Sequence, residues 1–222
     1  RRADPRDAWV RPDGEPPLSL KDLPEGATVA TSSLRRQAQV LVVRPDLRVI
    51  PVRGNVGTRL AKLDRREGGM DAMILACAGL RRLGLEARIT EALEPDVMLP
   101  AVGQGSLAIQ CREEDAEGLS LLRQLDDAPN RMAIEAERAF LATLEGGCQV
   151  PIAAHATREG EQLVLRGLVA SPDGQTVLED RWVGSPSEGG AAGEAMARGL
   201  LAQGAAALIE AGRLAHEAEM TP

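Results

Sequence analysis

The chain has 222 residues, enough for two domains with ordinary hydrophobic cores. Its hydrophobic content of 44% and charged content of 27% are typical of a soluble globular protein. The aromatic residues are only Trp9, Phe140 and Trp182, which argues against a base-stacking surface for single-stranded nucleic acid. No apolar run approaches the length of a membrane span, so we expect neither a nucleic acid nor a membrane as partner.

The net charge of −7 is unevenly spread along the chain. Residues 27–69 hold nine basic and three acidic residues, a local charge of +6, so the remainder carries −13. A basic patch on an acidic protein favours a small anionic ligand over a long polyanion, which the remainder would repel. A nucleic-acid binder that uses this segment is an alternative, and the scarcity of aromatic residues counts against it.

The cysteines Cys77, Cys111 and Cys148 are far apart and odd in number. They form no CxxC spacing, and His155 and His216 stand alone, so no metal site is predicted. Reduced thiols and a cytoplasmic location are the default expectation. There is no signal-peptide pattern and no initiator methionine, from which we expect the chain to begin within a longer protein.

In the first half, strand and helix patterns alternate. Residues 1–25 are polar and proline-rich, with one short element expected at 18–20. Strands are expected at 27–30, 47–52 and 71–76, and helices at 32–43, 58–66, 79–85 and 89–93. This series predicts a parallel sheet that is covered on both faces.

The second half is expected to form helices and a meander of strands. A glycine-broken connection is expected at 99–105, a weak strand at 107–111, and helices at 114–125 and 131–143, the latter with Ala133, Ala136, Phe140 and Leu144 on its apolar face. Strands at 152–157, 162–170 and 175–183 are separated by hairpin signals, so an antiparallel three-stranded sheet is predicted. A long helix over 187–211, ended by Gly212, should cover one face.

Arginines and hydroxyl groups follow the predicted strands of the first half. Arg35 and Arg36 come after the first strand, Arg53 and Arg59 after the second, and Arg82 after the third. Ligands of open α/β sheets bind at the carboxyl ends of strands, and helix N-termini and guanidinium groups there attract anions. The pattern predicts a cleft for a ligand with several carboxylates or phosphates. In contrast, we expect a solvated surface for Arg44, Arg48, Arg65 and Arg66.

The loop at residues 144–152 (LEGGCQVPI) is the strongest candidate for covalent chemistry. Two glycines before Cys148 let the backbone turn freely and leave the thiol uncrowded, and Pro151 stiffens the exit into the next strand. Apart from Glu145 no charge partner is near in sequence, so nothing predicts a lowered thiol pKa. The alternative interpretation is an ordinary small apolar residue at a turn.

This loop resembles the cofactor-attachment loop of the porphobilinogen deaminase (hydroxymethylbilane synthase) family. Three further stretches resemble the same family, in its order and at roughly its spacing: residues 31–37 (TSSLRRQ), 53–60 (RGNVGTRL) and 99–105 (LPAVGQG). Four ordered matches make a chance resemblance implausible.

The resemblance implies an α/β fold. The family has two lobes like those of periplasmic binding proteins and a small α+β domain that carries the cysteine. Residues 1–100 are expected to form the second, parallel-sheet lobe of the cleft. Residues 101–128 should be a hinge and a segment that returns to the first lobe, most of which is missing. Residues 129–222 should form the C-terminal domain, with a three-stranded antiparallel sheet and helices.

The resemblance also implies an activity. Family members are transferases of tetrapyrrole (haem and chlorophyll) biosynthesis, which polymerise four porphobilinogen units into hydroxymethylbilane with loss of ammonia. The cofactor is a dipyrromethane held by a thioether, here to Cys148. The partners are porphobilinogen and the growing pyrrole chain, and a monomer is expected. By motif position, cofactor carboxylates are bound by Thr31, Ser33, Arg35, Arg36, Arg53 and Arg59, and substrate by Arg82, Gln104 and Gly105.

One feature of the family is absent. The aspartate of a Ser-Met-Lys-Asp-Val-Pro-like stretch handles positive charge on the pyrrole nitrogens, and residues 20–24 (LKDLP) are only superficially similar. No catalytic residue is therefore assigned, and we expect this polypeptide alone to be inactive, with Leu107, Ile109, Leu119 and Leu122 exposed. The alternative function is a non-enzymatic anion-binding module of periplasmic-binding type, which gives no role to the glycines beside Cys148.

Overall fold

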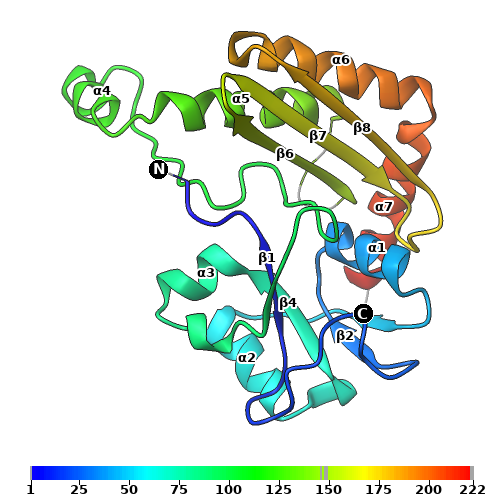
Figure 1. Ribbon diagram of the computed structural model, residues 1–222. Coiled ribbons are helices and arrows are strands. Elements are labelled where there is room, and N and C mark those ends of the chain that lie inside the picture. Colours follow the sequence, from blue (N-terminus) through cyan, green and yellow to red (C-terminus); the bar gives the residue numbers. More distant parts are fainter. Residues whose placement is uncertain (1, 146, 148–149, 221–222) are drawn as a thin grey trace.

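The computed structural model describes residues 2–145, 147 and 150–220, without the side chains of residues 219 and 220. The chain builds two β-sheets, each with its own covering helices (Figure 1). The fold is therefore mixed α/β, as expected. Cys148, the expected cofactor anchor, lies outside the described residues.

The first sheet has five strands in the order β3-β2-β4-β1-β5. They are β1 (Asp7–Val10), β2 (Thr28–Ala30), β3 (Arg48–Ile50), β4 (Ala72–Ala76) and β5 (Glu91–Leu93). β2 pairs in parallel with β3 and β4, but β1 runs antiparallel to both β4 and β5. The prediction of a parallel sheet is therefore wrong in part, because the sheet is mixed.

Strand β1 was not predicted, and its partner β5 was predicted as a helix. All four residues of β1 are buried, so the segment lacks the alternation that marks a half-exposed strand, and prolines surround it. Trp9 anchors it by donating its indole N–H to the carbonyl of Leu18 at 2.9 Å. Within the predicted helix 89–93, residues 91–93 form the edge strand β5 because they pair with β1, and a 3-10 turn, η2 (Glu86–Arg88), precedes them.

Helices cover both faces of this sheet, as predicted. They are α1 (Leu34–Val43), α2 (Val56–Asp64), η1 (Glu67–Gly69) and α3 (Cys77–Arg82). Side chains of β4 alternate: Met73 and Leu75 pack in a cluster with Leu63 of α2, whereas Ile74 packs with Val40 of α1. Helix α2 begins before the predicted Thr58, because the side chain of Asn55 accepts the Thr58 N–H and caps it.

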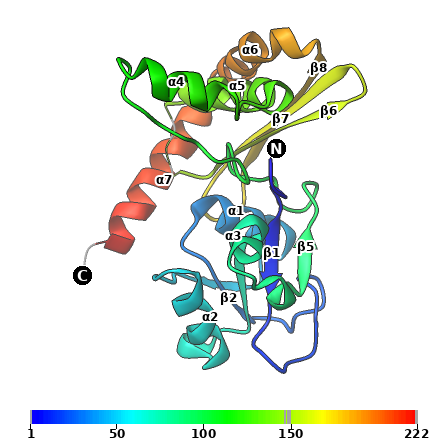
Figure 2. The same ribbon diagram turned by 90° about the vertical axis from the view of Figure 1, so that its left-hand side faces the viewer.

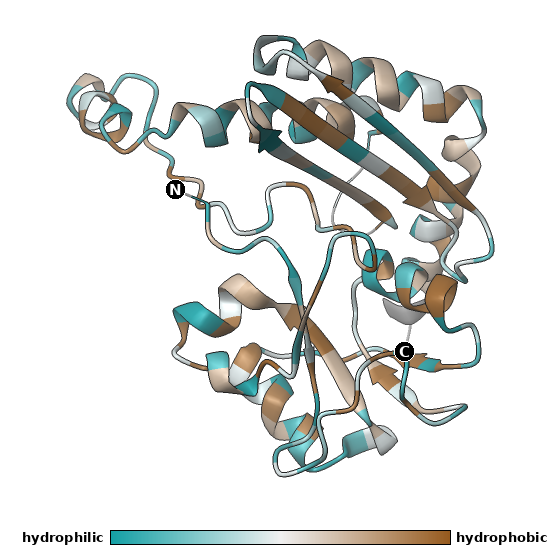
Figure 3. Ribbon diagram, viewed as in Figure 1, coloured by the Kyte–Doolittle hydropathy of each residue, from teal (hydrophilic) through white to brown (hydrophobic). Residues whose placement is uncertain are grey.

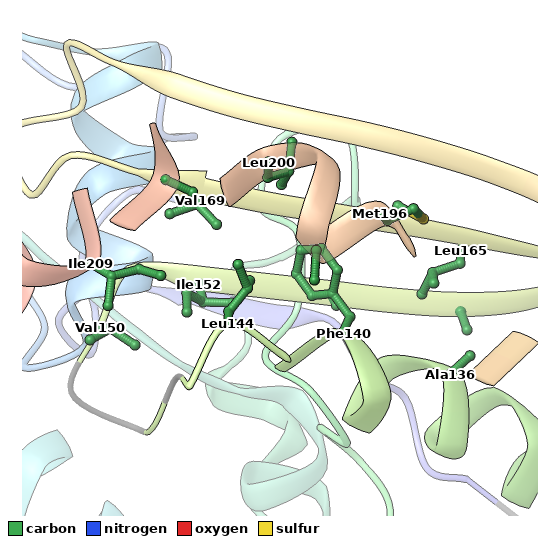
Figure 4. Close-up of a cluster of buried hydrophobic side chains, with 14 of the residues drawn as sticks. Ala136, Phe140, Leu144, Val150, Ile152, Leu165, Val169, Met196, Leu200 and Ile209 are labelled. Atoms are coloured by element: carbon green, nitrogen blue, oxygen red, sulfur yellow. The ribbon is translucent and has the colours of Figure 1, made fainter. Parts of the chain in front are cut away.

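The second sheet is the predicted antiparallel meander. It consists of β6 (Ile152–Glu159), β7 (Gln162–Ala170) and β8 (Val177–Gly184). Helices α5 (Ala128–Thr143) and α6 (Gly189–Ala202), the latter after η3 (Pro186–Glu188), cover one face. Phe140 of α5 fills the space between them with Leu165, Met196 and Leu200 (Figure 4). Hydrophobic residues run along much of β7, which lies in the middle of this sheet (Figure 3).

The predicted long C-terminal helix is two helices, α6 and α7 (Ala205–Met220). The chain breaks at Gly204, whose φ of 102° lies in the region that only glycine adopts readily. Gly212 was expected to end the helix, but it lies inside α7. There it faces Pro151: a Cβ on Gly212 would lie 2.5 Å from the Cδ of that proline.

The connection between the two sheets contains α4 (Ala116–Arg123) but no strand at 107–111, contrary to prediction. Helix α4 lies at the outer end of α5, away from both sheets (Figures 1 and 2). Leu107 and Ile109 are 71% and 58% exposed, as predicted. Leu119 and Leu122 are only half-exposed, whereas Leu121 and Leu125 are exposed. No helix of the described residues is long and apolar enough to span a membrane.

Buried Glu137 of α5 ties the N-terminal segment and the connection to the second sheet. Its carboxylate accepts from the guanidinium of Arg2 at 2.6 Å, from Gly103 N–H at 2.7 Å and from Ala156 N–H at 2.8 Å. The two sheets are thus held in one arrangement by a residue that sequence analysis did not single out.

The β7–β8 turn provides a second contact between the two parts. The side chain of Gln37 donates to the carbonyl of Pro172 at 3.2 Å. Gly174, with φ of 70°, approaches α1 so closely that a Cβ would lie 2.7 Å from the carbonyl oxygen of Ala38. This places the second sheet against the helix that carries Arg35 and Arg36.

Candidate functional site

A cavity of about 380 Å³ lies where the two parts meet, a size that suits a small ligand. It is lined by Ser32, Ser33, Arg35, Arg36, Arg59, Ala101, Val102, Gln104, Leu141, Gly147, Val150 and Ile152. The serines and arginines follow β2 and β3, as the strand-end argument predicted. The lining also includes Gly147 and Val150, the described residues that flank Cys148 in the sequence.

The cavity has a cationic wall and an apolar wall. Three arginines and the Gln104 amide come from the first sheet and the connection, whereas Leu141, Val150 and Ile152 come from the part that carries the second sheet. A ligand with flat apolar rings and carboxylate substituents matches both walls.

Asp7 lies behind the cationic wall and is fully buried. Its carboxylate accepts from Arg35 Nη1 at 2.8 Å, from Arg36 Nη2 at 2.7 Å and Nε at 3.0 Å, and from Gln104 Nε2 at 3.0 Å. Burial opposes ionisation of Asp7, but the charges of Arg36 and Arg35 outweigh it and hold the pKa of Asp7 below its usual range. Sequence analysis missed Asp7 because it missed β1, and no local signal marks it.

The two arginines differ in how far their donors are used. Arg35 is buried and also donates to the carbonyl of Leu99 at 2.7 Å and to Gln104 Oε1 at 3.5 Å. Burial lowers the pKa of Arg35, yet a guanidinium in a protein keeps its proton, so the contact with Asp7 is ionic. Arg36 is partly exposed and donates otherwise only to the carbonyl of Ile74, which leaves N–H groups without an acceptor among the described residues.

Arg59 completes the cationic wall. Its Nε donates to the carbonyl of Gly54 at 2.7 Å, and no carboxylate contacts it within the described part of the chain. Burial and the nearby Arg36 lower the pKa of Arg59. Gly54 has φ of 123°, and a Cβ there would lie 2.8 Å from Thr58, so only glycine fits this turn. A half-buried cation beside a second cation favours an anionic ligand.

The remaining predicted residues, Thr31, Arg53, Arg82 and Gly105, are not among those that line the cavity. Thr31 is buried, and its hydroxyl accepts a hydrogen bond from the N–H of Ser33. Ser33 directly precedes α1, and its side chain does not cap that helix. Arg53 and Arg82 are exposed. Gly105 approaches the N-terminal segment, since a Cβ on it would lie 2.6 Å from the carbonyl oxygen of Ala3.

The arginines expected on the surface behave in two ways. Arg65 pairs with Glu67, and Arg66 with Glu15 and Asp71, all on the surface, and Arg48 is exposed, as expected. Arg44 instead has only 17% of its side chain exposed, and besides Asp46 it donates to the carbonyls of Leu20, Lys21 and Leu23. It holds that segment to the end of α1, so the solvated interpretation is wrong for Arg44.

Two of the three cysteines are described. Cys77 is buried, and burial raises the pKa of its thiol to about 11, so it is a poor nucleophile. Cys111 is exposed. Across residues 2–145, 147 and 150–220, no group of three or more His, Cys, Asp or Glu side chains could hold a metal ion.

Comparison with known proteins identifies two family domains in the chain. Residues 1–120 match the family model described as "Porphobilinogen deaminase, dipyromethane cofactor binding domain", and residues 132–202 match that of "Porphobilinogen deaminase, C-terminal domain". Thus the segment with the arginine wall falls in the cofactor-binding model, and the cysteine loop falls in the C-terminal one.

Three curated relatives are named porphobilinogen deaminase. The one from Roseiflexus sp. (strain RS-1) is 53% identical over 209 residues, 94% of this chain and 67% of the relative. Those from Brevibacillus brevis and Syntrophotalea carbinolica are 50% and 49% identical, over 92% and 95% of this chain and 64% and 65% of their own length. The chain spans about two thirds of the length of these relatives, and it belongs to the porphobilinogen deaminase family.

Proposed function

We propose that the cavity holds the dipyrromethane of a hydroxymethylbilane synthase, joined by a thioether to Cys148. The observation that carries this proposal is that three arginines line one cavity together with apolar side chains and with Gly147 and Val150, which flank Cys148 in the sequence. A dipyrromethane has flat rings with several carboxylates, so its chemistry fits the donors that line the cavity. A plain thiol suffices as anchor, because a carbon–sulfur bond need not turn over.

The residues of this chain would bind and orient the ligand. Arg36 and Arg59 would bind carboxylates of the cofactor and of the growing pyrrole chain by donating hydrogen bonds to them. Leu141, Val102 and Ile152 would pack on the rings and exclude water. Thr31, Ser33, Arg53, Arg82, Gln104 and Gly105 keep their proposed binding roles from the motif positions. The cofactor supplies the pyrrole carbon to which the porphobilinogen units are added.

We further propose the domain organisation of the family for this chain. Residues 1–100 would be a lobe like that of periplasmic binding proteins, 101–128 a hinge and returning segment, and 129–222 the C-terminal domain. The protein would act in the cytoplasm, as a monomer, on porphobilinogen and without nucleic acid.

This polypeptide alone would not turn over porphobilinogen. It contains no stretch like the family's aspartate motif, and Asp22, the one superficial match, is exposed and accepts from Ser19 Oγ at 2.5 Å. Asp22 is not among the residues that line the cavity. The chain would thus supply ligand binding but not the catalytic carboxylate.

Ehrlich's aldehyde reagent in acid tests the proposal against its alternative. The protein expressed from its complete gene should develop the colour of a dipyrromethane, and Cys148→Ala should not. A wild-type protein that stays colourless while still binding small anions would favour a non-enzymatic anion-binding module instead.

A further inference from the structure

We propose that Asp7 is a positioning residue that holds the guanidinium of Arg36 in the orientation in which Arg36 and Arg59 receive the two carboxylates of one pyrrole unit. The inference rests on the proposed function, because it assigns the ligand carboxylates of that same cavity. It concerns a residue that contacts no ligand itself and acts through Arg36.

The geometry of Asp7 favours this role over simple charge neutralisation. Its Oδ2 accepts a hydrogen bond from Arg35. Its Oδ1 accepts hydrogen bonds from Nε and Nη2 of Arg36 and from the side-chain amide of Gln104. A contact through both Nε and Nη2 fixes the plane of the Arg36 guanidinium. Neutralising the buried Arg35 would need only one oxygen, so the second oxygen serves Arg36, which is partly exposed and could otherwise turn toward solvent.

The charge of the cavity matches a dicarboxylate. Arg35, Arg36 and Arg59 contribute three positive charges, and Asp7 removes one. The resulting +2 equals the charge of the acetate and propionate groups on one pyrrole unit. Because Asp7 lies fully buried on β1 and binds two arginines of the neighbouring helix α1, these arginines keep their positions before a ligand arrives.

A double variant that keeps the charge of the cavity tests whether Asp7 positions Arg36 or only neutralises the charge of Arg35. Asp7→Asn/Arg35→Met removes both partners of the buried pair, which avoids an isolated buried charge. It leaves Arg36 and Arg59, so the cavity keeps a charge of +2. Affinity for porphobilinogen, measured by titration calorimetry on the protein expressed from its complete gene with Cys148→Ala, whose cavity then carries no covalent cofactor, should fall at least tenfold when the double variant is added. Binding within about twofold of the Cys148→Ala parent would overturn the proposal.

A second variant guards against misfolding of the first. Asp7→Glu keeps the charge but adds one methylene, which shifts both arginines. We expect a melting temperature within a few degrees of wild type, an affinity reduced about tenfold and no change in its dependence on salt. Unchanged affinity would again overturn the role of Asp7. The surface variant Arg65→Met, which removes an exposed ion pair with Glu67, is the matched control.

Chemical modification decides the positioning role without any ligand. Phenylglyoxal modification, mapped by peptide mass spectrometry, should reach Arg36 several times faster in the double variant than in wild type, relative to exposed Arg82. Equal rates would overturn the positioning role even if porphobilinogen binds. Failure of wild type to bind porphobilinogen, with Arg36 protected by Asp7, would instead overturn only the proposed function.

Discussion

Similar arginines of this chain have different functions because their surroundings differ. Arg65 and Arg66 pair with carboxylates in water, where an ion pair contributes little. Arg35 is buried against Asp7, and Arg59 lies half-buried without a carboxylate in the described part of the chain. We therefore expect Arg36 and Arg59 to contribute more to the binding of ligand carboxylates than Arg35, Arg65 or Arg66.

Replacing Arg59 should weaken ligand binding without unfolding the protein. Arg59→Leu removes a charge-assisted contact, which should cost about 1.5–3 kcal/mol of binding free energy. Titration with porphobilinogen measures the loss, and Arg65→Leu should cost less than about 0.5 kcal/mol. Equal losses in the two variants would show that the strand-end argument fails.

His155 should make the stability of the fold depend on pH. Burial, with Arg2 and Arg166 nearby, lowers the pKa of His155 from 6.5 to about 4. As the pH falls, His155 is therefore protonated in the unfolded chain before it is protonated in the folded protein. The contribution of neutral His155 to the free energy of unfolding is fully present above pH 6.5 and is lost as the pH falls toward 4, by on the order of 2–3 kcal/mol.

Urea unfolding between pH 4 and 7 checks this, with His155→Gln as the matched variant. The free energy of unfolding of wild type should fall relative to the variant over that window, because the neighbouring carboxylates, including Glu137, titrate in both proteins. Parallel curves for the two proteins would contradict a neutral buried histidine.

At the scale of elements, the close packing of α5 against α6 depends on a glycine. A Cβ on Gly193 would lie 2.4 Å from the carbonyl oxygen of Ala136, so Gly193→Ala should destabilise the protein by about 1–3 kcal/mol. Gly199 lies in the same helix with nothing within 4 Å of such a Cβ. Gly199→Ala should stabilise by up to about 1 kcal/mol. Thermal unfolding of both variants tests this, and a shift in the same direction would contradict it.

Sequence reasoning identified the elements whose pattern is local. The strand patterns and the hairpin signals between them predicted the meander, and the arginines after β2 and β3 predicted three of the cavity residues. It missed β1, because four buried residues carry no period and only pairing with β4 makes them a strand. Asp7 was missed with it, and Leu141 was expected only as part of a helix.

At the scale of the whole molecule, polar and apolar contacts join the two parts of the chain. Glu137, the Gly174 turn and a buried cluster of Ala38, Leu99, Ala153, Leu168 and Ala170 hold them together, and the cavity lies where they meet. Arg2 donates to Glu137 from the N-terminal segment, so loss of this ion pair should loosen the joint rather than either sheet. Arg2→Ala should therefore leave the far-ultraviolet circular dichroism unchanged while lowering the melting temperature by several degrees. An unchanged melting temperature would contradict this.

The segment at 107–125 should make the 222-residue polypeptide prone to aggregate. Leu107, Ile109, Leu121 and Leu125 expose large apolar side chains on a connection that packs on neither sheet. The double variant Leu107→Ser/Ile109→Ser should scatter less light after incubation than wild type does, and its melting temperature should be unchanged. Serine substitutions at half-buried Leu119 and Leu122 should also lower the melting temperature. Under the proposed domain organisation, supplying the first lobe in trans should reduce aggregation as well, because that lobe would cover these side chains.

The most direct test of the proposed function is the intact mass of the protein expressed from its complete gene. Wild type, Cys77→Ala and Cys111→Ala should each carry an added mass of two pyrrole units, and Cys148→Ala should carry none. An adduct that survives in Cys148→Ala, or is lost only in Cys77→Ala or Cys111→Ala, would contradict the assignment of the cavity beside Gly147 and Val150 as the cofactor site.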